Sequence, residues 1–166
     1  MNSIGIDVGK KICRASIKDQ HGRILHELSF SNDTAGIGSL LSAASRYGRA
    51  RAVVESTGNM WMRIHDTLED HGVETVLANP IKTKVIAQAR IKNDRLDARI
   101  LADLLRGNLV YESYVPSKEW REKRSLVRHR VSLVKARTAL RNKVHALLDK
   151  YEYFTHYSTS SSIEQN

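Results

Sequence analysis

Cysteine is nearly absent from this chain of 166 residues, which contains only Cys13. A single thiol excludes an internal disulfide and a thiolate metal cluster. Cys13 lies in a strand-like run, where a cysteine behaves as a small apolar side chain. We therefore expect a buried thiol without a chemical role.

Long apolar segments are missing as well. No apolar run approaches the roughly 20 residues that cross a bilayer, and the N-terminus lacks the basic-then-apolar layout of a signal peptide. No two histidines have the spacing of zinc ligands, and we expect His65 and His71 to lie on a helix surface. These absences predict a cytoplasmic protein with no membrane partner.

Positive charge is abundant but confined to one region. The formal net charge is +9, and the segment from Lys118 to Lys150 holds eleven Lys or Arg residues against three acids. The rest of the chain is close to neutral. An excess concentrated in one segment predicts a polyanionic partner, with nucleic acid the leading candidate.

The order of predicted elements indicates the fold class. Strands are expected at 3–9, 12–18, 24–30, 50–56 and 73–78, and helices at 33–47, 59–71, from Pro80, and at 92–106. Three strands followed by alternating helices and strands is the order of ribonuclease H-like folds. We predict an α/β domain over residues 1–112 with a mixed five-stranded sheet and flanking helices, then a long basic helix over 113–150 and a disordered tail over 151–166.

Four acids are candidates for one site. In such a fold the first strand is central and the fourth lies beside it, which would bring Asp7 and Glu55 together. Asp94 and Asp97 are three residues apart on the helix predicted over 92–106, so both could face one point. Asp103 on the same helix is expected to face solvent. The alternative for Asp94 and Asp97 is that they only complement the dipole of the first helical turn.

Four converging carboxylates predict a magnesium site. Hard oxygen ligands, completed by water and phosphate, suit Mg²⁺, and Mn²⁺ could replace it. Two such ions stabilise the attacking and leaving oxygens of a phosphodiester during in-line displacement. The sequence therefore predicts Asp7, Glu55, Asp94 and Asp97 as metal ligands and catalytic residues.

Four motifs together carry a family resemblance: Ile4-Gly-Ile-Asp-Val-Gly-Lys10, Val53-Val-Glu-Ser-Thr-Gly58, Ala78-Asn-Pro80 and Lys92-Asn-Asp-Arg-Leu-Asp-Ala98. In this order and spacing they resemble the N-terminal domain of the DEDD transposases of the insertion-sequence one-hundred-and-ten family, across approximately residues 3–150. The resemblance implies a RuvC-like domain whose four acids bind magnesium, and enzymes that recombine DNA guided by a bridge RNA. Asn93 stands where family members usually have threonine.

The predicted long helix begins after Ser117, which can cap it. Leucines recur every seven residues at 126, 133, 140 and 147, which suits coiled-coil-like packing against the domain, a hairpin partner or a second chain. We expect the second chain, and therefore a homo-oligomer. Its other positions are rich in cations that could neutralise nucleic-acid phosphates. The candidate nucleic-acid-binding residues are Arg121, Lys123, Arg124, Arg128, Arg130, Lys135, Arg137, Arg141 and Lys143. The alternative is the solvated face of a dimerising helix.

Three functions remain open at this point. The first is the metal-binding catalytic domain of a DNA transposase that acts by Mg²⁺-dependent phosphoryl transfer, in a truncated chain. The resemblance implies a further C-terminal domain with a serine nucleophile, for which the 16 residues after Lys150 are too short. The second is a non-catalytic transposase remnant that binds nucleic acid and dimerises. The third is an actin-like phosphotransferase, because Ile6-Asp-Val-Gly9 resembles a first phosphate loop, although no second glycine-rich loop follows.

Overall fold

The computed structural model describes residues 1–55, 58–91 and 97–151, and only the backbone of Arg90 and Ile91. The chain divides into two compact units, Met1–Val115 and Pro116–Asn166. The predicted disordered tail lies outside the described residues beyond Tyr151.

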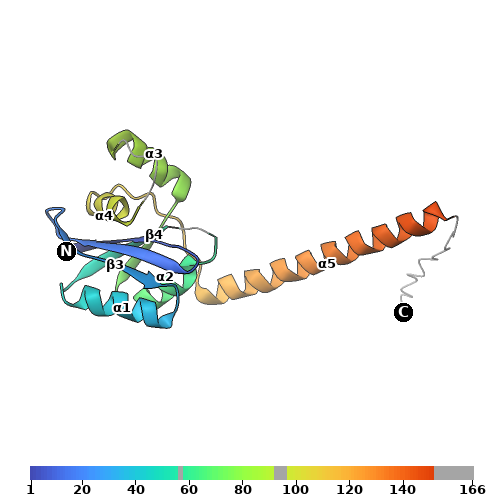
Figure 1. The fold of residues 1–166 in the computed structure, drawn as a ribbon, viewed down its shortest axis with the longest axis horizontal. Coiled ribbons are helices and arrows are strands. Elements are labelled where there is room, and N and C mark those ends of the chain that lie inside the picture. Colours follow the sequence, from blue (N-terminus) through green and yellow to red (C-terminus); the bar gives the residue numbers. More distant parts are fainter. Residues whose placement is uncertain (56–57, 92–96, 152–166) are drawn as a thin grey trace, which may run out of the picture. The chain divides into compact units, whose positions relative to one another are not determined.

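The first unit is built on one mixed sheet of five strands in the order β3-β2-β1-β4-β5 (Figure 1). The strands are β1 (Asn2–Asp7), β2 (Ile12–Lys18), β3 (Ile24–Ser31), β4 (Ala50–Glu55) and β5 (Glu74–Ala78). β2 is antiparallel to both β1 and β3, whereas β1, β4 and β5 run parallel to one another. The predicted antiparallel meander, the central first strand and the ribonuclease H-like order are confirmed.

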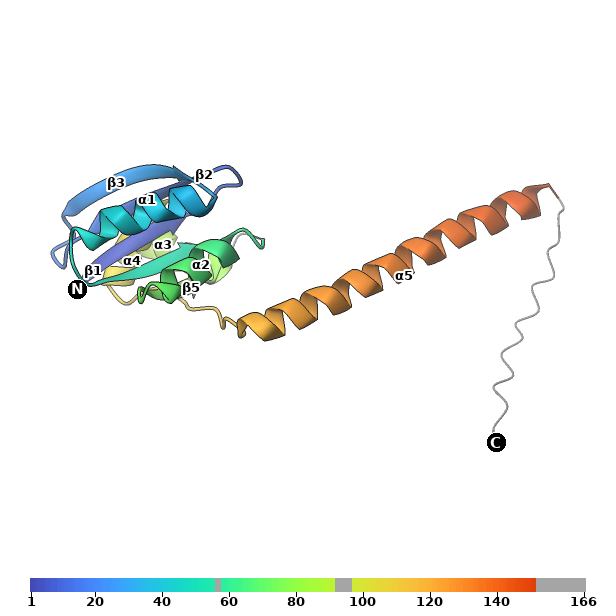
Figure 2. The ribbon, with the colours of Figure 1, turned by 90° about the horizontal axis from the view of Figure 1, so that it is seen from below.

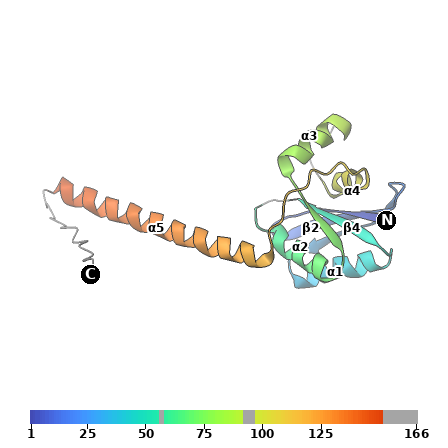
Figure 3. The same ribbon diagram turned by 180° about the vertical axis from the view of Figure 1, so that it is seen from behind.

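Helices cover both faces of this sheet. α1 (Thr34–Ser45) and α2 (Trp61–Asp70) lie on one face, and α4 (Ala98–Arg106) lies on the other with α3 (Pro80–Ile91) packed beyond it (Figures 1 and 3). Asp33 caps α1 as predicted, because its carboxylate accepts a hydrogen bond from Gly36 N at 2.8 Å.

Side chains alternate between the two faces of the sheet along the central strands, so the apolar core has two parts, one on each face. Ile4, Ile6 and Val54 point to the face covered by α1 and α2, where they are fully buried with Ile37 and Leu40. Val53 points to the opposite face and packs against Leu101 and Leu105 of α4. Because side chains alternate along a strand, the residues that share a face with Val53 also point toward α4. Cys13 belongs to the first core and is buried, as predicted.

Gly5 lets α4 approach the sheet closely. A Cβ atom at this position would lie 2.0 Å from the carbonyl oxygen of Ala98 and 2.4 Å from the amide nitrogen of Ala102. These are backbone atoms of the helix, so they could make room only if the whole helix moved. The absence of a side chain at Gly5 therefore sets the distance between β1 and the first turn of α4.

Two ion pairs fix α4 along the sheet. Lys18 of β2 contacts Asp103 at 2.6 Å, and only 7% of the lysine side chain is exposed. Arg99 donates to both carboxylate oxygens of Glu27 on β3, each at 2.6 Å. The prediction that Asp103 faces solvent is wrong, because a buried lysine requires a charge partner and Asp103 supplies it.

One histidine is also placed differently from the prediction. His65 is 8% exposed and packs edge-on against Trp61, with ring centroids 5.6 Å apart. The neighbouring Ile64 and Leu68 point into the same core, so the inward face of α2 is wide enough to include His65. His71 is exposed, as expected.

The second unit contains the predicted long helix. α5 (Lys118–Lys150) has 33 residues, which corresponds to a length of about 50 Å. Ser117 caps it by accepting a hydrogen bond from Trp120 N at 3.4 Å. None of its residues is buried, and its winding is continuous in Figure 2. Within the described ranges, no helix combines the length and apolar character needed to cross a membrane.

Candidate active site

Two of the predicted acids stand side by side at the ends of adjacent parallel strands. Asp7 ends β1 and Glu55 ends β4, and the register pairs the preceding residues, Ile6 and Val54. Neighbouring strands lie about 4.8 Å apart, and paired residues point to the same face. Both carboxylates therefore point to the α4 face, at the edge where ligands bind in open α/β sheets.

The electrostatics of Glu55 reflect this placement. Partial burial raises the pKa of Glu55 above its ordinary value, and the negative charge of Asp7 raises it further. Two neighbouring carboxylates that are partly removed from water repel each other. A cation between them would relieve this repulsion, so the pair suits a divalent ion bound through oxygen.

Glu55 should make the metal-free protein less stable as the pH rises. Between about pH 4.5, the ordinary pKa of the residue, and its raised pKa, the folded protein holds more protons than the unfolded chain. The free energy of unfolding therefore falls as the pH increases through this window. In chemical denaturation in a chelator from pH 4 to pH 8, carboxylates with a lowered pKa, such as Glu27, contribute the opposite slope, so the contribution of Glu55 is the difference between wild type and Glu55→Gln. The stability of Glu55→Gln relative to wild type should increase as the pH rises.

The matched control is Asp70→Asn, which removes an exposed carboxylate from the end of α2. This variant should follow the wild-type pH dependence. Identical slopes for wild type and Glu55→Gln would contradict a repulsive pair at this edge of the sheet.

Asp97 does not lie inside a helix, so the prediction of a helix that includes Asp97 is wrong. α4 begins at Ala98, and Asp97 is its N-cap, with an extended backbone and a carboxylate that accepts a hydrogen bond from Ile100 N at 3.0 Å. Four backbone N–H groups at the start of a helix lack partners, and an aspartate directly before them satisfies one. The helical spacing expected between Asp94 and Asp97 therefore does not apply at Asp97.

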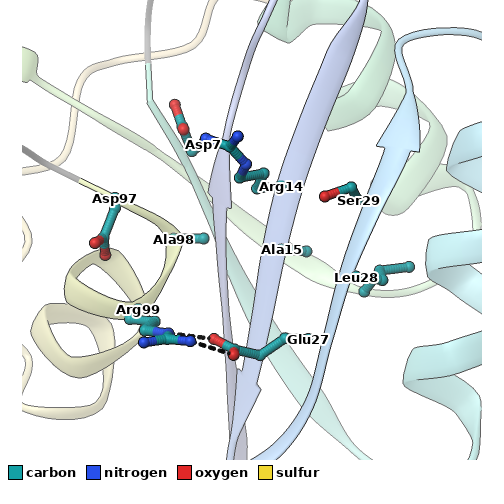
Figure 4. A pocket seen from close by; sticks show the side chains of 9 residues that line it. All are labelled: Asp7, Arg14, Ala15, Glu27, Leu28, Ser29, Asp97, Ala98 and Arg99. Atoms are coloured by element: carbon teal, nitrogen blue, oxygen red, sulfur yellow. Dashed lines mark hydrogen bonds and ion pairs between the residues drawn. The ribbon is translucent and has the colours of Figure 1, made fainter.

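The carboxyl groups of Asp7 and Asp97 line one hollow but do not point toward each other (Figure 4). Asp94 lies outside the described residues. Across the described ranges, no three His, Cys, Asp or Glu side chains are grouped closely enough to hold a metal ion. The structure thus brings Asp7 and Glu55 to neighbouring strand ends and places Asp97 at the hollow that Asp7 also lines, with one carboxylate oxygen of Asp97 engaged by the helix.

The hollow has a volume of about 430 Å³ and contains side chains that sequence reasoning missed. Arg14 of β2 is the register partner of Asp7 and lies beside it (Figure 4). Arg99 and Glu27 form the opposite wall and are paired with each other. Strand alternation was the available signal, because Arg14 stands between the buried Cys13 and Ala15 and must point to the α4 face.

The nine predicted nucleic-acid-binding residues lie on α5. Arg124, Arg128 and Lys135 are exposed and follow one another at intervals of four and seven, which places them on one side of the helix. The leucine row at 126, 133, 140 and 147 is also exposed and lies on a different side. Three of the other cations, Arg130, Arg137 and Arg141, lie beside this leucine row.

Residues 4–153 match a family of transposases designated DEDD_Tnp_IS110. The curated transposase for insertion sequence element IS1111A of Coxiella burnetii (strain RSA 493 / Nine Mile phase I) is 27% identical over 152 residues. That alignment covers 89% of this chain and 39% of the relative. The chain therefore spans about two fifths of the length of this relative.

Solved structures are similar at a lower level. RuvC of T. thermophilus in complex with a Holliday junction substrate aligns with a TM-score of 0.45 and 13% identity, over 68% of this chain and 99% of that one. The ROK hexokinase of Thermus thermophilus aligns with a TM-score of 0.38 and 17% identity, over 57% and 39%. Values this low assign no function.

Proposed function

Because the chain belongs to the IS110-type family of DEDD transposases, we propose that its first unit is the metal-binding part of a DNA transposase. The observation that carries this proposal is the adjacency of Asp7 and Glu55 at the ends of β1 and β4. Asp94 and Asp97 complete the proposed set of ligands, with Mg²⁺ as the ion and Mn²⁺ as a substitute.

The donor set fits such an ion. Asp7 and Glu55 offer hard oxygen atoms on one face of the sheet. Burial raises the pKa of Glu55, and the charge of Asp7 raises it further, a repulsion that a divalent cation would relieve. Among the described residues, only the Oδ1 atom of Asp97 is engaged, by Ile100 N, which leaves Oδ2 for a ligand. When bound, Mg²⁺ would polarise a phosphoryl oxygen and stabilise charge on the displaced oxygen.

The protein's own residues would orient the substrate. Arg14 lines the hollow beside Asp7, where its guanidinium could hold a phosphate oxygen. The ion pair between Arg99 and Glu27 holds the start of α4 against the sheet, and that between Lys18 and Asp103 holds its second half. This anchoring would keep Asp97 at the hollow during phosphoryl transfer.

α5 is proposed to supply nucleic-acid contact and self-association. Its exposed cations suit DNA and, by family resemblance, a structured guide RNA. Its exposed leucine row suits pairing with a second copy of the helix. Opposite placement of these two rows would allow one helix to serve both purposes at once.

Metal-dependent stabilisation tests the proposal. Mg²⁺ or Mn²⁺ should raise the melting temperature of the wild type, with a stabilisation of about 2.7 kcal/mol at a concentration of about 100 times Kd. Asp7→Asn and Glu55→Gln should lose most of this shift, and Asp94→Asn and Asp97→Asn should reduce it. Scanning fluorimetry with and without the metal measures the effect.

Asp70→Asn is again the control, because this exposed acid lies on α2, on the other face of the sheet. It should keep the full metal shift. An unchanged shift in both Asp7→Asn and Glu55→Gln would count against the metal site.

The second candidate is a non-catalytic protein that binds nucleic acid and dimerises. The observation that favours it is the exposed cationic surface of α5, which does not depend on the acids. Nucleic-acid binding that persists without divalent metal and in the acid variants, together with no metal-dependent stabilisation of the wild type, would select this alternative.

A further inference from the structure

A second hollow lies on the first unit and has a different character. It has a volume of about 490 Å³ and is lined by Lys10, Asn32, Asn59, Met60 and Arg63. Two cations and two amides line it, without an acidic side chain. Lys10 lies on the β1–β2 connection, and Arg63 lies on the first turn of α2.

Arg63 is held in place but keeps donors available. Its guanidinium donates to the carbonyl oxygen of Asn32 at 3.0 Å, and the side-chain amide of Asn32 donates to the carbonyl oxygen of Gly9 at 3.1 Å. An arginine has five N–H donors, so most remain for a ligand. This small network fixes the guanidinium at the rim of the hollow.

Among the described residues, no acid competes strongly for these cations. Asp33 is an acid whose carboxylate interacts electrostatically with Arg63. The Oδ1 atom of Asp33 already accepts hydrogen bonds from Gly36 N at 2.8 Å and from Ser31 Oγ at 2.7 Å. Within the described residues, Lys10 is exposed and no ion pair to it is found. Two cations without a carboxylate between them favour an anion.

The hollow lies close to the proposed metal site along the chain. Lys10 follows Asp7 by three residues, which span at most about 11 Å. Asn59 follows Glu55 by four residues, or at most about 14 Å. The acids point to the α4 face and Arg63 lies on α2, on the other face of the sheet, so a nucleic-acid strand that crosses the carboxyl ends of β1 and β4 could present neighbouring phosphates to both.

We infer that the Lys10–Arg63 hollow binds a backbone phosphate of the nucleic-acid strand whose neighbouring phosphodiester lies at Asp7 and Glu55. This inference rests on the proposed function. The guanidinium of Arg63 and the ammonium of Lys10 contact the nonbridging oxygens, and the amides of Asn32 and Asn59 line the walls. The phosphate would fix the register of the strand relative to the acids.

Salt-dependent binding by the full chain tests this inference. Lys10→Gln/Arg63→Gln should weaken binding of a labelled oligonucleotide by about three- to tenfold at 0.1 M salt and lower the slope of log K against log salt concentration by about one. Fluorescence anisotropy with DNA and with RNA measures both. If the variant loses affinity for only DNA or only RNA, that nucleic acid occupies the hollow. If it loses affinity for both, either can occupy it.

Arg46→Gln/Arg49→Gln is the matched control, because it removes the same charge from exposed positions before β4, at the other end of the strand from Glu55. It should leave the slope unchanged, and Lys10→Arg/Arg63→Lys should keep most of the affinity. Equal losses in the test and control variants, or no loss in either arm, would overturn the inference. The test variant should also keep the Mg²⁺-induced melting shift, so a failed metal site would be recognised separately.

Discussion

Gly5→Ala should lower the free energy of unfolding of the first unit by about 3 kcal/mol or more. The new Cβ would lie 2.0 Å from Ala98 O and 2.4 Å from Ala102 N, far inside van der Waals contact. Relief requires α4 to move away from β1, which would open the packing of Leu101 against Val53. Domains of this size are stable by only about 5–15 kcal/mol, so the loss is a large fraction of the total.

The displacement should also reach the proposed metal site. Asp97 caps the first turn of α4, so a helix that moves outward carries this carboxylate away from Asp7. Urea denaturation measures the stability, and metal-induced melting shifts measure the site. We expect both to fall in Gly5→Ala.

Gly38→Ala is the matched control. A Cβ at Gly38 in α1 meets no atom within 4 Å, and alanine is the better helix former by about 1 kcal/mol. This variant should be as stable as the wild type or more so. Similar behaviour of the two alanine variants would show that close packing of α4 on Gly5 does not limit stability.

Removing one cationic row from α5 should have the largest effect on affinity. Arg124→Gln/Arg128→Gln/Lys135→Gln changes three exposed side chains on one side of the helix. If each neutralises one phosphate, the salt slope for duplex DNA falls by about 2.7 and the affinity at 0.1 M salt falls on the order of a hundredfold. Titrations at several salt concentrations measure both quantities.

Two control variants distinguish the effect of this cationic row from the effect of the total positive charge of α5. Arg124→Lys/Arg128→Lys/Lys135→Arg keeps the charge and should retain the salt slope. Arg130→Gln/Arg137→Gln/Arg141→Gln removes the same charge beside the leucine row, where we propose that a second copy of the helix packs. This triple variant should lose less affinity, and an equal loss would mean that binding is spread over all sides of α5.

The pattern of side chains was sufficient to predict the framework of the first unit. Alternation of Ile4 and Ile6 with Asp7 set which face of the first strand is buried, and turn residues set the succession of strands and helices. From that order alone, the neighbouring positions of β1 and β4 and hence of Asp7 and Glu55 could be predicted. The same alternation also indicates that Arg14 points to the α4 face, but the prediction did not include Arg14.

The start of α4 was predictable in principle but was placed wrongly. An aspartate three residues before Ile100 is a capping signal, and the structure uses Asp97 in this way. Two acids at an interval of three also fit a helical turn, so the local sequence supported both positions. The tight contact of α4 with Gly5 is a long-range feature that local propensity does not contain.

The sequence by itself determined the order of the elements, the face on which each strand residue lies and the confinement of positive charge to α5, because these depend on spacing and composition along the chain. Only the tertiary structure decided that Lys18 buries against Asp103, that α4 packs directly on the backbone of β1 at Gly5 and that Lys10 and Arg63 share a hollow. Each of these contacts joins residues from different elements. Their geometry depends on how closely helices pack on the sheet, which no local pattern specifies.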